Sequence, residues 1–304
     1  MIHSGSSPVR LARSLQQILG SSYSHAKREV EVGHAMVNSE IVTDPGLVLG
    51  PSDRITHDPA LPRRVPEAML RNIEIVFLDD HIVVVNKPPG LLVHPTLDRE
   101  KDTLISRVTD EVKRRVGHHS KILVVHRIDR DTSGLLVMAR TGAAVTSLQR
   151  QFRVHTISRC YLALVQGDLQ EECAIDRAIG RPRPGARRAV VTHSRDAQNA
   201  QTRVRPIERY GVATLIEATL GTGRTHQVRV HLTWLGHPVL GDSLYGDPKH
   251  DPTPVPRLAL HAAHLGFNHP ANQNPVQFDA PLPPDLQGIT TVLRHKKNTG
   301  KRRL

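Results

Sequence analysis

Short apolar runs separated by polar loops extend along most of the chain, and their lengths predict both strands and helices. Strands are predicted over 73–77, 82–85, 122–125, 135–139, 158–167, 202–204 and 212–218. Helices are predicted over 9–19, 24–32, 104–116 and 143–152. No segment repeats at a fixed period, so the pattern does not indicate a solenoid or another repeat architecture.

The first sixty residues form a pattern of their own. Four apolar residues share one face of the first predicted helix: Leu11, Leu15, Ile18 and Leu19. Basic residues lie off that face or on the second helix: Arg10, Arg13, Lys27 and Arg28. Gly33 ends the second helix, and residues 36–42 predict a hairpin with an Asn-Ser turn.

Composition divides the chain into four parts. A small domain is predicted over 8–58, and three prolines stiffen a linker over 59–71. A larger domain follows over 72–290. The tail, 291–304, has six basic residues and no acidic one, so we expect a disordered arm that adds affinity for a polyanion.

The charge of the chain restricts its partners. The 304 residues carry a net charge of +12, from 41 Lys and Arg against 29 Asp and Glu. This excess favours nucleic acid over membrane, although a generally basic solvated surface has the same composition. Two cysteines cannot form a disulfide framework, and the 19 histidines lack metal-site spacing, so we expect no metal. Without a membrane-length apolar stretch or a signal-peptide core, we expect a soluble, cytoplasmic protein.

A polar loop between the runs 122–125 and 135–139 contains the candidate chemistry. Asp129 stands between Arg127 and Arg130, so we expect its carboxylate to stay ionised near neutral pH. Loops held by buried strands commonly carry functional residues. The alternative is a connecting turn with solvated charges, or Asp131 and Ser133 acting as helix caps.

Longer motifs favour the functional interpretation. The segment HRIDRDTSGLL, residues 126–136, is similar to the HRLDxxTSGLL signature of the RluA-type pseudouridine synthases. Further segments resemble motifs of the same family: NKPPGLLVHP at 86–95, RCYLALVQG at 159–167, TGRTHQVRVH at 222–231 and GHPVLGDSLYG at 236–246. Arg159 stands where the family prefers lysine. Residues 8–58 resemble an S4-like RNA-binding domain, so the resemblance covers nearly the whole chain.

The resemblance implies an α+β fold, a mixed and mainly antiparallel sheet with flanking helices and a central cleft, preceded by the small RNA-binding domain. It implies that Asp129 is the catalytic aspartate, that Arg229 pairs with it, and that Tyr161 stacks on the uracil or assists C5 deprotonation. Arg127 would fill the space of the flipped base or bind phosphate. The other implied RNA-binding residues are Arg10, Arg13, Lys27, Arg28 and His34. The reaction is redox-neutral and adds no group, so we expect no cofactor, and we expect a monomer.

Several alternatives remain open at this stage. The substrate is large-subunit rRNA or tRNA, and the sequence does not identify the uridine that is modified. A non-catalytic RNA-binding or ribosome-assembly protein would share the charge and the N-terminal domain. A glycoside hydrolase needs a second carboxylate and a kinase needs other motifs, and neither is found. The arginine-rich segment 177–195 contacts phosphate or is solvated surface.

Overall fold

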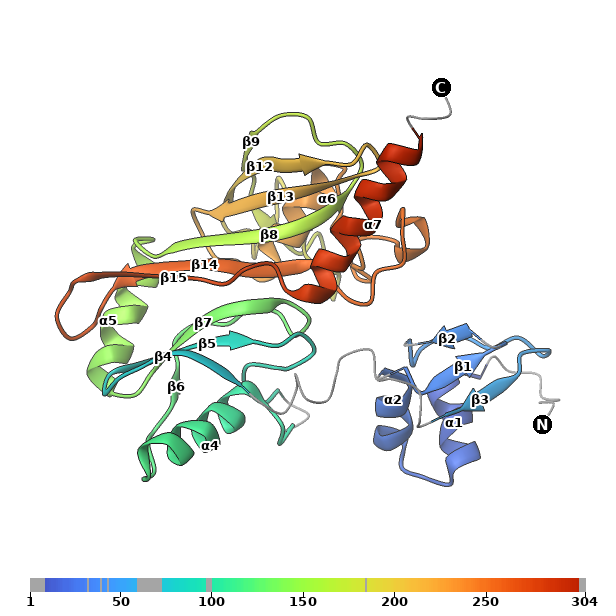
Figure 1. Cartoon of the computed structure of the whole chain (residues 1–304), viewed down its shortest axis with the longest axis horizontal. Coiled ribbons are helices and arrows are strands. Elements are labelled where there is room, and N and C mark those ends of the chain that lie inside the picture. The colour runs from blue at the N-terminus through green and yellow to red at the C-terminus, as the bar shows by residue number, and fades with distance from the viewer. Residues whose placement is uncertain are drawn as a thin grey trace. The chain divides into compact units, whose positions relative to one another are not determined.

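The structure, a computed structural model, describes residues 9–31, 33–38, 40–42, 44–58, 73–96, 100–183 and 185–300. The chain divides into two compact units, Met1–Asn72 and Ile73–Leu304 (Figure 1). The linker that the sequence predicts over 59–71 lies outside the described residues.

The first unit contains two helices and a three-stranded antiparallel sheet of order β2-β1-β3. Its elements are α1 Leu11–Leu19, α2 Tyr23–Glu31, β1 Ala35–Val37, β2 Glu40–Val42 and β3 Ile55–His57. The predicted hairpin is present as β1 and β2, and Asn38 in its turn has a φ of 53°. Asparagine adopts this left-handed conformation more readily than most residues, which explains how the Asn-Ser turn reverses the chain.

The buried face of α1 differs in one position from the predicted one. Leu11 and Leu15 are fully buried, and Leu19 packs against the same core. These positions are four residues apart and form one row along the helix. Ile18 is 56% exposed, so the prediction that it shares the buried face was wrong. It lies beside this row, in the last turn of a helix of nine residues.

The second unit is built on one ten-stranded sheet. Eight strands follow the order β4-β5-β7-β14-β8-β13-β12-β9, while β6 pairs with β7 and β15 pairs with β14. The strands are β4 Glu74–Leu78, β5 Ile82–Lys87, β6 Leu123–Val124, β7 Ser133–Ala139, β8 Ser158–Gln166, β9 Cys173–Asp176, β12 Gln201–Arg209, β13 Ala213–Leu220, β14 Leu260–Asn268 and β15 Pro275–Asp279. All paired neighbours in this sheet are antiparallel except β7 and β14. The predicted α+β class with a mixed, mainly antiparallel sheet is therefore confirmed.

Two helices cover opposite faces of the sheet around β5 and β7. Side chains alternate along a strand, so Val83 and Val85 face α4 Leu104–Val116, whereas Val84 faces α5 Gly142–Arg153. Both faces of these strands are buried, which explains why 82–85 and 135–139 are continuous apolar runs. Thr103 and Thr141 cap the two helices by accepting hydrogen bonds from Ser106 N and Ala144 N.

The remaining elements are α6 Gln227–Trp234, the short 3-10 helix Pro248–His250, α7 Pro284–Gly300, and a two-stranded sheet of β10 Ile179–Gly180 and β11 Ala189–Val190. The β10–β11 sheet lies within the arginine-rich segment 177–195. Among the helices that the structure describes, none combines the length and apolar character needed to cross a membrane.

The C-terminal segment is helical as far as Gly300. The disordered tail predicted over 291–304 is therefore wrong for 291–300, and 301–304 lie outside the described residues. Leu286, Ile289 and Leu293 recur at helical spacing and are buried in the core, so they hold α7 on the domain. Arg294 forms an ion pair with Glu208 at 2.6 Å, which places part of the basic cluster against the protein surface.

Candidate active site

The loop from β6 to β7 carries Asp129 and is fixed by a buried lysine. Lys87 is fully buried, and its Nζ donates hydrogen bonds to the carbonyl oxygens of Pro88, Leu91 and Arg130 at 2.7–2.9 Å. These bonds connect the Pro-Pro-Gly turn after β5 to the residue that follows Asp129. Burial lowers the pKa of Lys87 to about 7, and the negative charges of Asp131 and Asp129 oppose this decrease.

A glycine allows the end of this loop to approach β14. Gly134 has a φ of 115° and pairs with Ala262 in the parallel register of β7 and β14. A Cβ atom at position 134 would lie 2.2 Å from the carbonyl oxygen of Ala262, so only glycine fits. Next to it, the Ser133 hydroxyl lies 2.9 Å from Nδ1 of the buried His261. The SG pair of the motif thus has a structural role at the base of the loop.

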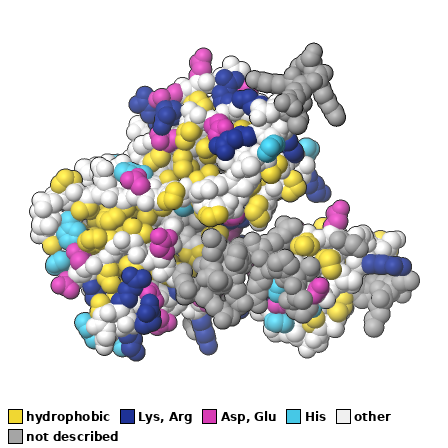
Figure 2. Space-filling model, viewed as in Figure 1, with side chains coloured by type: hydrophobic (Ala, Val, Ile, Leu, Met, Phe, Trp, Pro, Cys, Tyr) yellow, Lys and Arg dark blue, Asp and Glu magenta, His cyan; other side chains and the backbone are white. Residues whose placement is uncertain are grey.

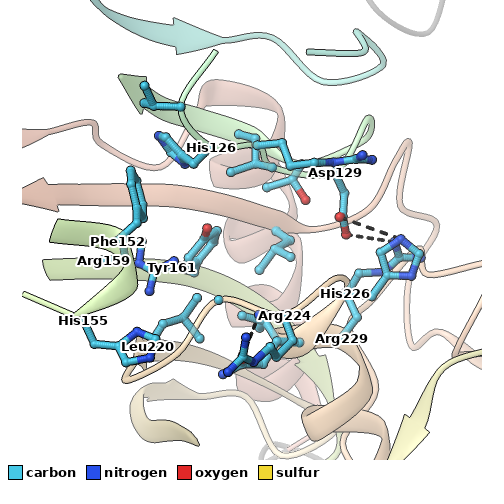
Figure 3. A pocket seen from close by; sticks show the side chains of 18 of the residues that line it. His126, Asp129, Phe152, His155, Arg159, Tyr161, Leu220, Arg224, His226 and Arg229 are labelled. Atoms are coloured by element: carbon cyan, nitrogen blue, oxygen red, sulfur yellow. Dashed lines mark hydrogen bonds and ion pairs between the residues drawn. The ribbon is translucent and has the colours of Figure 1, made fainter. Parts of the chain in front are cut away.

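The second motif delivers Arg229 to the same place. Gln227, at the start of α6, is 2% exposed, and its side-chain oxygen accepts hydrogen bonds from Thr222 and from the backbone N–H of Arg224. These bonds fix the loop before the helix. His226 precedes α6 with a φ of 60°. Arg229, two residues into the helix, then points toward the loop of Asp129 (Figure 3).

One guanidinium group binds two carboxylates. Arg229 Nη1 donates to Asp129 Oδ2 at 3.1 Å, while its Nε and Nη2 donate to the two oxygens of Asp242 at 2.7 and 2.8 Å. Asp242 is 1% exposed and also accepts from the backbone N–H groups of Leu244 and Tyr245. Asp242 therefore anchors Arg229, and Arg229 in turn orients Asp129.

Both partners of the buried pair are held in their charged forms. Burial alone would lower the pKa of Arg229, but its hydrogen bonds and attraction to Asp242 and Asp129 raise this pKa above its ordinary value. Burial likewise opposes ionisation of Asp242, yet the bonds from Arg229 lower the pKa of Asp242 below its ordinary value. The positive charge beside Asp129 is thus permanent at any pH at which the protein is folded.

A histidine and a tyrosine complete this end of the site. His226 Nε2 lies 3.8 Å from Asp129 Oδ1, and His226 Nδ1 lies 2.8 Å from the Tyr245 hydroxyl. The guanidinium of Arg229 stacks over the Tyr245 ring, 5.1 Å from its centroid. Burial lowers the pKa of His226, as do the charges of Arg229 and Arg127, so its neutral form predominates near neutral pH.

Asp129, Arg229 and Tyr161 line one cavity of about 650 Å³ in the second unit. Tyr161 lies on β8, where it pairs with Ala218 and Ala262 of the neighbouring strands. In Figure 3 its ring stands between Asp129 and Arg229 on one side and Arg159, Phe152 and His126 on the other. Burial raises the pKa of Tyr161 to about 12, so its hydroxyl remains protonated at neutral pH.

Comparison with known proteins decides the family. The model of the RNA pseudouridylate synthase family matches residues 81–234. The chain is 37% identical over 296 residues to the ribosomal large subunit pseudouridine synthase D of Zymomonas mobilis, and the match covers 93% of each chain. The chain belongs to the RNA pseudouridylate synthase family.

Other family members resemble the chain over most of its length. Identity to the ribosomal large subunit pseudouridine synthase C of Vibrio vulnificus is 34% over 276 residues, which cover 88% of this chain and 83% of that one. The solved structure of human RNA pseudouridylate synthase domain containing 4 superimposes with a TM-score of 0.61 at 26% identity, covering 75% of this chain and 95% of that one. The family resemblance of the sequence motifs is thereby confirmed.

The predicted source of charge around Asp129 was only partly right. The sequence places Asp129 between Arg127 and Arg130, but Arg130 donates instead to Asp131 at 3.2 Å. Arg127 is exposed and lines the cavity, and no hydrogen bond or ion pair among the described residues involves it. The group that binds Asp129 comes from Arg229, a hundred residues downstream.

The sequence did not assign a role to two members of the site. Asp242 and Tyr245 were visible only as letters of the GHPVLGDSLYG motif, and their contacts with Arg229 arise from the tertiary fold. One feature of the sequence could have indicated this role: Asp242 belongs to the motif at 236–246, which follows soon after the motif that contains Arg229. Buried arginines need more than one acceptor, so a second carboxylate was to be expected.

The basic residues predicted to bind RNA in the first unit are exposed. They are Arg10, Arg13, Lys27 and Arg28. Arg13 stacks over the ring of Tyr23, and Lys27 lies 3.8 Å from Glu31. His34 is 2% exposed and bonds to Glu29, so the expectation that it faces RNA was wrong.

The positive charge of the second unit is not gathered in a single patch on the face drawn in Figure 2, where Lys and Arg side chains lie among acidic ones. Ion pairs account for several arginines of this unit. Arg114 and Arg115 pair with Glu111, Arg203 with Glu172, and Arg209 with Asp168. In the segment 177–195, Arg177 stacks over Trp234, and Arg187 donates to the carbonyl oxygen of Leu244, so at least these two have structural contacts.

Proposed function

We propose that this protein isomerises uridine to pseudouridine in large-subunit ribosomal RNA, with Asp129 as the catalytic carboxylate. The observation that carries the proposal is the contact of Asp129 with Arg229 inside a cavity that also holds Tyr161. Membership of the family supports the reaction, and the printed names of the relatives in Zymomonas and Vibrio support the substrate.

The reaction makes demands that these residues meet. The uridine must leave its stack to reach a carboxylate inside a cavity. The C1′–N1 bond then breaks, a C1′–C5 bond forms, and the proton on C5 is lost while N1 gains one, so the overall composition is unchanged. Asp129 serves by attack on the sugar or the ring, or by stabilising a sugar cation on a glycal route. In each case the hydrogen bond from Arg229 holds the carboxylate in a fixed orientation.

Tyr161 fits one of its two predicted roles better. A phenol whose pKa is raised to about 12 is a poor base at neutral pH, because forming the phenolate in this buried position is unfavourable. Its ring stands in the middle of the cavity and offers a flat apolar surface to the extruded uracil (Figure 3). We therefore assign Tyr161 to stacking.

The site is less suited to hydrolysis of a glycosidic bond. Asp129 is the one carboxylate among the residues that line the cavity. Asp131 is half-exposed and pairs with Arg130, and Asp242 is bound to Arg229. A glycoside hydrolase needs a second carboxyl group as general acid, so the isomerase is favoured.

Substitution of Asp129 tests this proposal. Asp129→Asn keeps the shape of the side chain but removes its charge, so release of tritium from RNA with C5-tritiated uridine should fall by about 10³-fold or more. RNA binding should persist. Asp131→Asn is the matched control and should stay within a few-fold of wild type. Near-normal turnover by Asp129→Asn would reject the assignment, and no tritium release by the wild type would favour a non-catalytic RNA-binding protein.

The substrate requires a separate experiment. Sequencing of pseudouridine positions in ribosomal and transfer RNA from a deletion strain should reveal loss at one or a few large-subunit rRNA positions. Loss confined to tRNA would favour the alternative substrate. We expect the enzyme to act as a cytoplasmic monomer, without a cofactor, since the isomerisation is redox-neutral.

For the first unit we propose the role of an S4-like RNA-binding domain. The exposed residues Arg10, Arg13, Lys27 and Arg28 on or next to its two helices support this role. Lys27→Glu combined with Arg28→Glu should weaken binding to a folded rRNA fragment more than binding to a short stem-loop, because only the larger RNA can contact both units. Equal affinities of the variant and the wild type for the rRNA fragment would contradict this role.

A further inference from the structure

The cavity contains a second buried arginine that the proposed chemistry does not use. Arg159 and Arg229 are each 9% exposed and both line the cavity. Arg229 has two carboxylate partners, whereas no hydrogen bond or ion pair among the described residues involves the side chain of Arg159, and its Nε is buried without an acceptor. A buried guanidinium without a counter-charge is unfavourable, so the free protein keeps this group at a cost to its stability.

The structure holds the guanidinium of Arg159 in one place. It lies over the ring of Phe152, 5.5 Å from the centroid, and Phe152 in turn stacks with His126 at 4.5 Å. A Cβ atom at Gly223 would lie 2.3 Å from Arg159 Nη1, so the glycine makes room for the fork. The side chain of Arg159 is thus held by packing while it lines the cavity (Figure 3).

The surroundings of Arg159 favour an anion. Arg224 lies near enough for its charge to lower the pKa of Arg159 further, after burial as the main cause. His126 is a neutral neighbour: its Nε2 accepts from the backbone N–H of Val137, and burial lowers its pKa to about 3. The carboxylate that lines the cavity, Asp129, is bound by Arg229 on the other side of Tyr161. An anionic ligand would therefore supply the negative charge that is missing beside Arg159.

We propose that Arg159 binds a phosphodiester group of the substrate strand, beside the uridine that enters the cavity. The inference rests on the proposed function and specifies how that site holds its RNA. Arg159 and Tyr161 are two residues apart on β8, so their side chains share one face of the sheet. An RNA strand that places a uracil against Tyr161 thus brings a neighbouring phosphate to the guanidinium of Arg159. The paired N–H donors of a guanidinium match two phosphate oxygens. Arg159 is a substrate-binding residue, distinct from the catalytic Asp129.

The test combines a variant of the protein with a change in the RNA. Full-length Arg159→Gln should reduce kcat/KM by about 10- to 100-fold, mostly through KM, as expected for loss of a charge-assisted hydrogen bond. RNAs with one neutral methylphosphonate at each position around the target uridine serve as probes. At one position the methylphosphonate should reduce kcat/KM of the wild type to a similar extent, yet have little further effect on Arg159→Gln.

Two controls keep the result interpretable. Arg159→Lys retains the positive charge but not the planar guanidinium, so it should recover part of the loss in kcat/KM that Arg159→Gln causes. Such a recovery would distinguish a loss of RNA binding from misfolding. Arg203→Gln changes an exposed arginine that pairs with Glu172 away from the cavity, and should respond to every methylphosphonate as the wild type does. The slope of log affinity against log salt should fall by about 0.7 for Arg159→Gln alone, the value for one contact to a single strand.

The proposal would be overturned if the effects of Arg159→Gln and of the methylphosphonates on kcat/KM were independent of each other. If each methylphosphonate affects Arg159→Gln as much as the wild type, and the salt slope is unchanged, Arg159 contacts the uracil or acts only in packing. Turnover of the unmodified RNA by the wild type tests the proposed function separately. Turnover without coupling between Arg159 and any phosphate would reject this inference alone.

Discussion

Each unit of the protein contains a buried carboxylate at the centre of a small polar cluster, and the two clusters use different basic side chains. In the second unit Asp242 binds the guanidinium of Arg229 through two hydrogen bonds of 2.7 and 2.8 Å. In the first unit a single oxygen of Glu29 lies 2.8 Å from Nδ1 of His34 and 2.8 Å from Nε2 of His57. Both carboxylates are more than 90% buried.

The basic side chain of each cluster fits the contacts that the cluster makes. A guanidinium keeps its charge at every pH of biological interest and offers donors in a planar fork. Arg229 can therefore bind Asp242 on one edge and still donate to Asp129. A neutral imidazole has a single N–H donor, so each histidine can donate to one acceptor only. Two histidines thus meet at one oxygen of Glu29, which joins α2 to the start of β1 and to β3.

The two carboxylates bound by Arg229 also differ from each other. The side chain of Asp242 is fully buried, whereas that of Asp129 is 19% exposed and accepts one hydrogen bond, of 3.1 Å, from Arg229. The shorter and more numerous bonds belong to Asp242, the carboxylate that lies outside the lining of the cavity. Fixing one end of the guanidinium leaves Asp129 oriented but open to the cavity.

The largest effect is expected from removing the anchor. Asp242→Ala leaves Arg229 buried with an unpaired fork, so the free energy of unfolding of the second unit should fall by about 3–5 kcal/mol. Turnover should fall more than tenfold at temperatures where the variant is folded. Denaturant unfolding and tritium release measure the two effects. Asp129→Asn, which removes the more exposed partner, should cost about 1 kcal/mol or less. Equal stability losses would remove the distinction between the two carboxylates.

A smaller loss of stability is expected from Arg229→Lys, and its main effect should be on catalysis. The charge remains, but an ammonium group cannot span two carboxylates in a planar arrangement. Because Asp129 then loses its fixed orientation, kcat should fall about 10²-fold while the affinity for RNA stays near wild type. Single-turnover kinetics and a filter-binding titration separate the two quantities. A fall in affinity with unchanged kcat would place Arg229 in RNA binding.

Glu29→Gln should have a moderate effect confined to the first unit. The amide can satisfy at most part of the contacts with His34 and His57, so the local free energy of unfolding should decrease by about 1–3 kcal/mol. Hydrogen exchange followed by mass spectrometry resolves the two units in the intact protein. Faster exchange in α2 and β3, with no change around Asp129, is expected. A change in both units would indicate that the clusters are coupled.

The smallest effect concerns acidity. The pKa of Glu29 is lowered from 4.5: burial opposes ionisation, but the bonds and charges of His57 and His34 outweigh it. The carboxylate thus contributes stability that is fully present above about pH 4.5 and is lost as the pH falls through the lowered value. The difference in exchange between wild type and Glu29→Gln should decrease as the pH falls below about 4.5. A difference that grows on acidification would contradict this assignment.

The sequence predicted more of the fold than of the contacts within the site. Strands around 82–85 and 135–139 were predictable because residues buried on both faces form continuous apolar runs. The helix at the end of the chain was not predicted. Its basic residues indicated a disordered tail, although Leu286, Ile289 and Leu293 recur at helical spacing. The arginines next to Asp129 in the sequence were a weak guide to its partner. Neighbouring residues along an irregular loop point in different directions, and the side chain that binds Asp129 is that of Arg229.

The contact between Asp129 and Arg229 could be anticipated only through the family resemblance. No periodicity relates residues a hundred positions apart, and nothing in the local sequence of either residue indicates the other. Arg159 was noted for its departure from the family pattern, but its lack of partners is a property of the folded chain. Unpaired buried groups of this kind are invisible in a sequence and become evident only when every neighbour is known.

The close approach at Gly134 has a consequence for the whole enzyme. The parallel register between β7 and β14 spans two residue pairs, and it is the seam where the half of the sheet that carries Asp129 meets the half that carries Tyr161. A methyl group at position 134 would clash with the backbone of Ala262 and push β7 and β14 apart. Gly134→Ala should therefore spread the halves and disable the enzyme while every side chain that touches the uridine is unaltered.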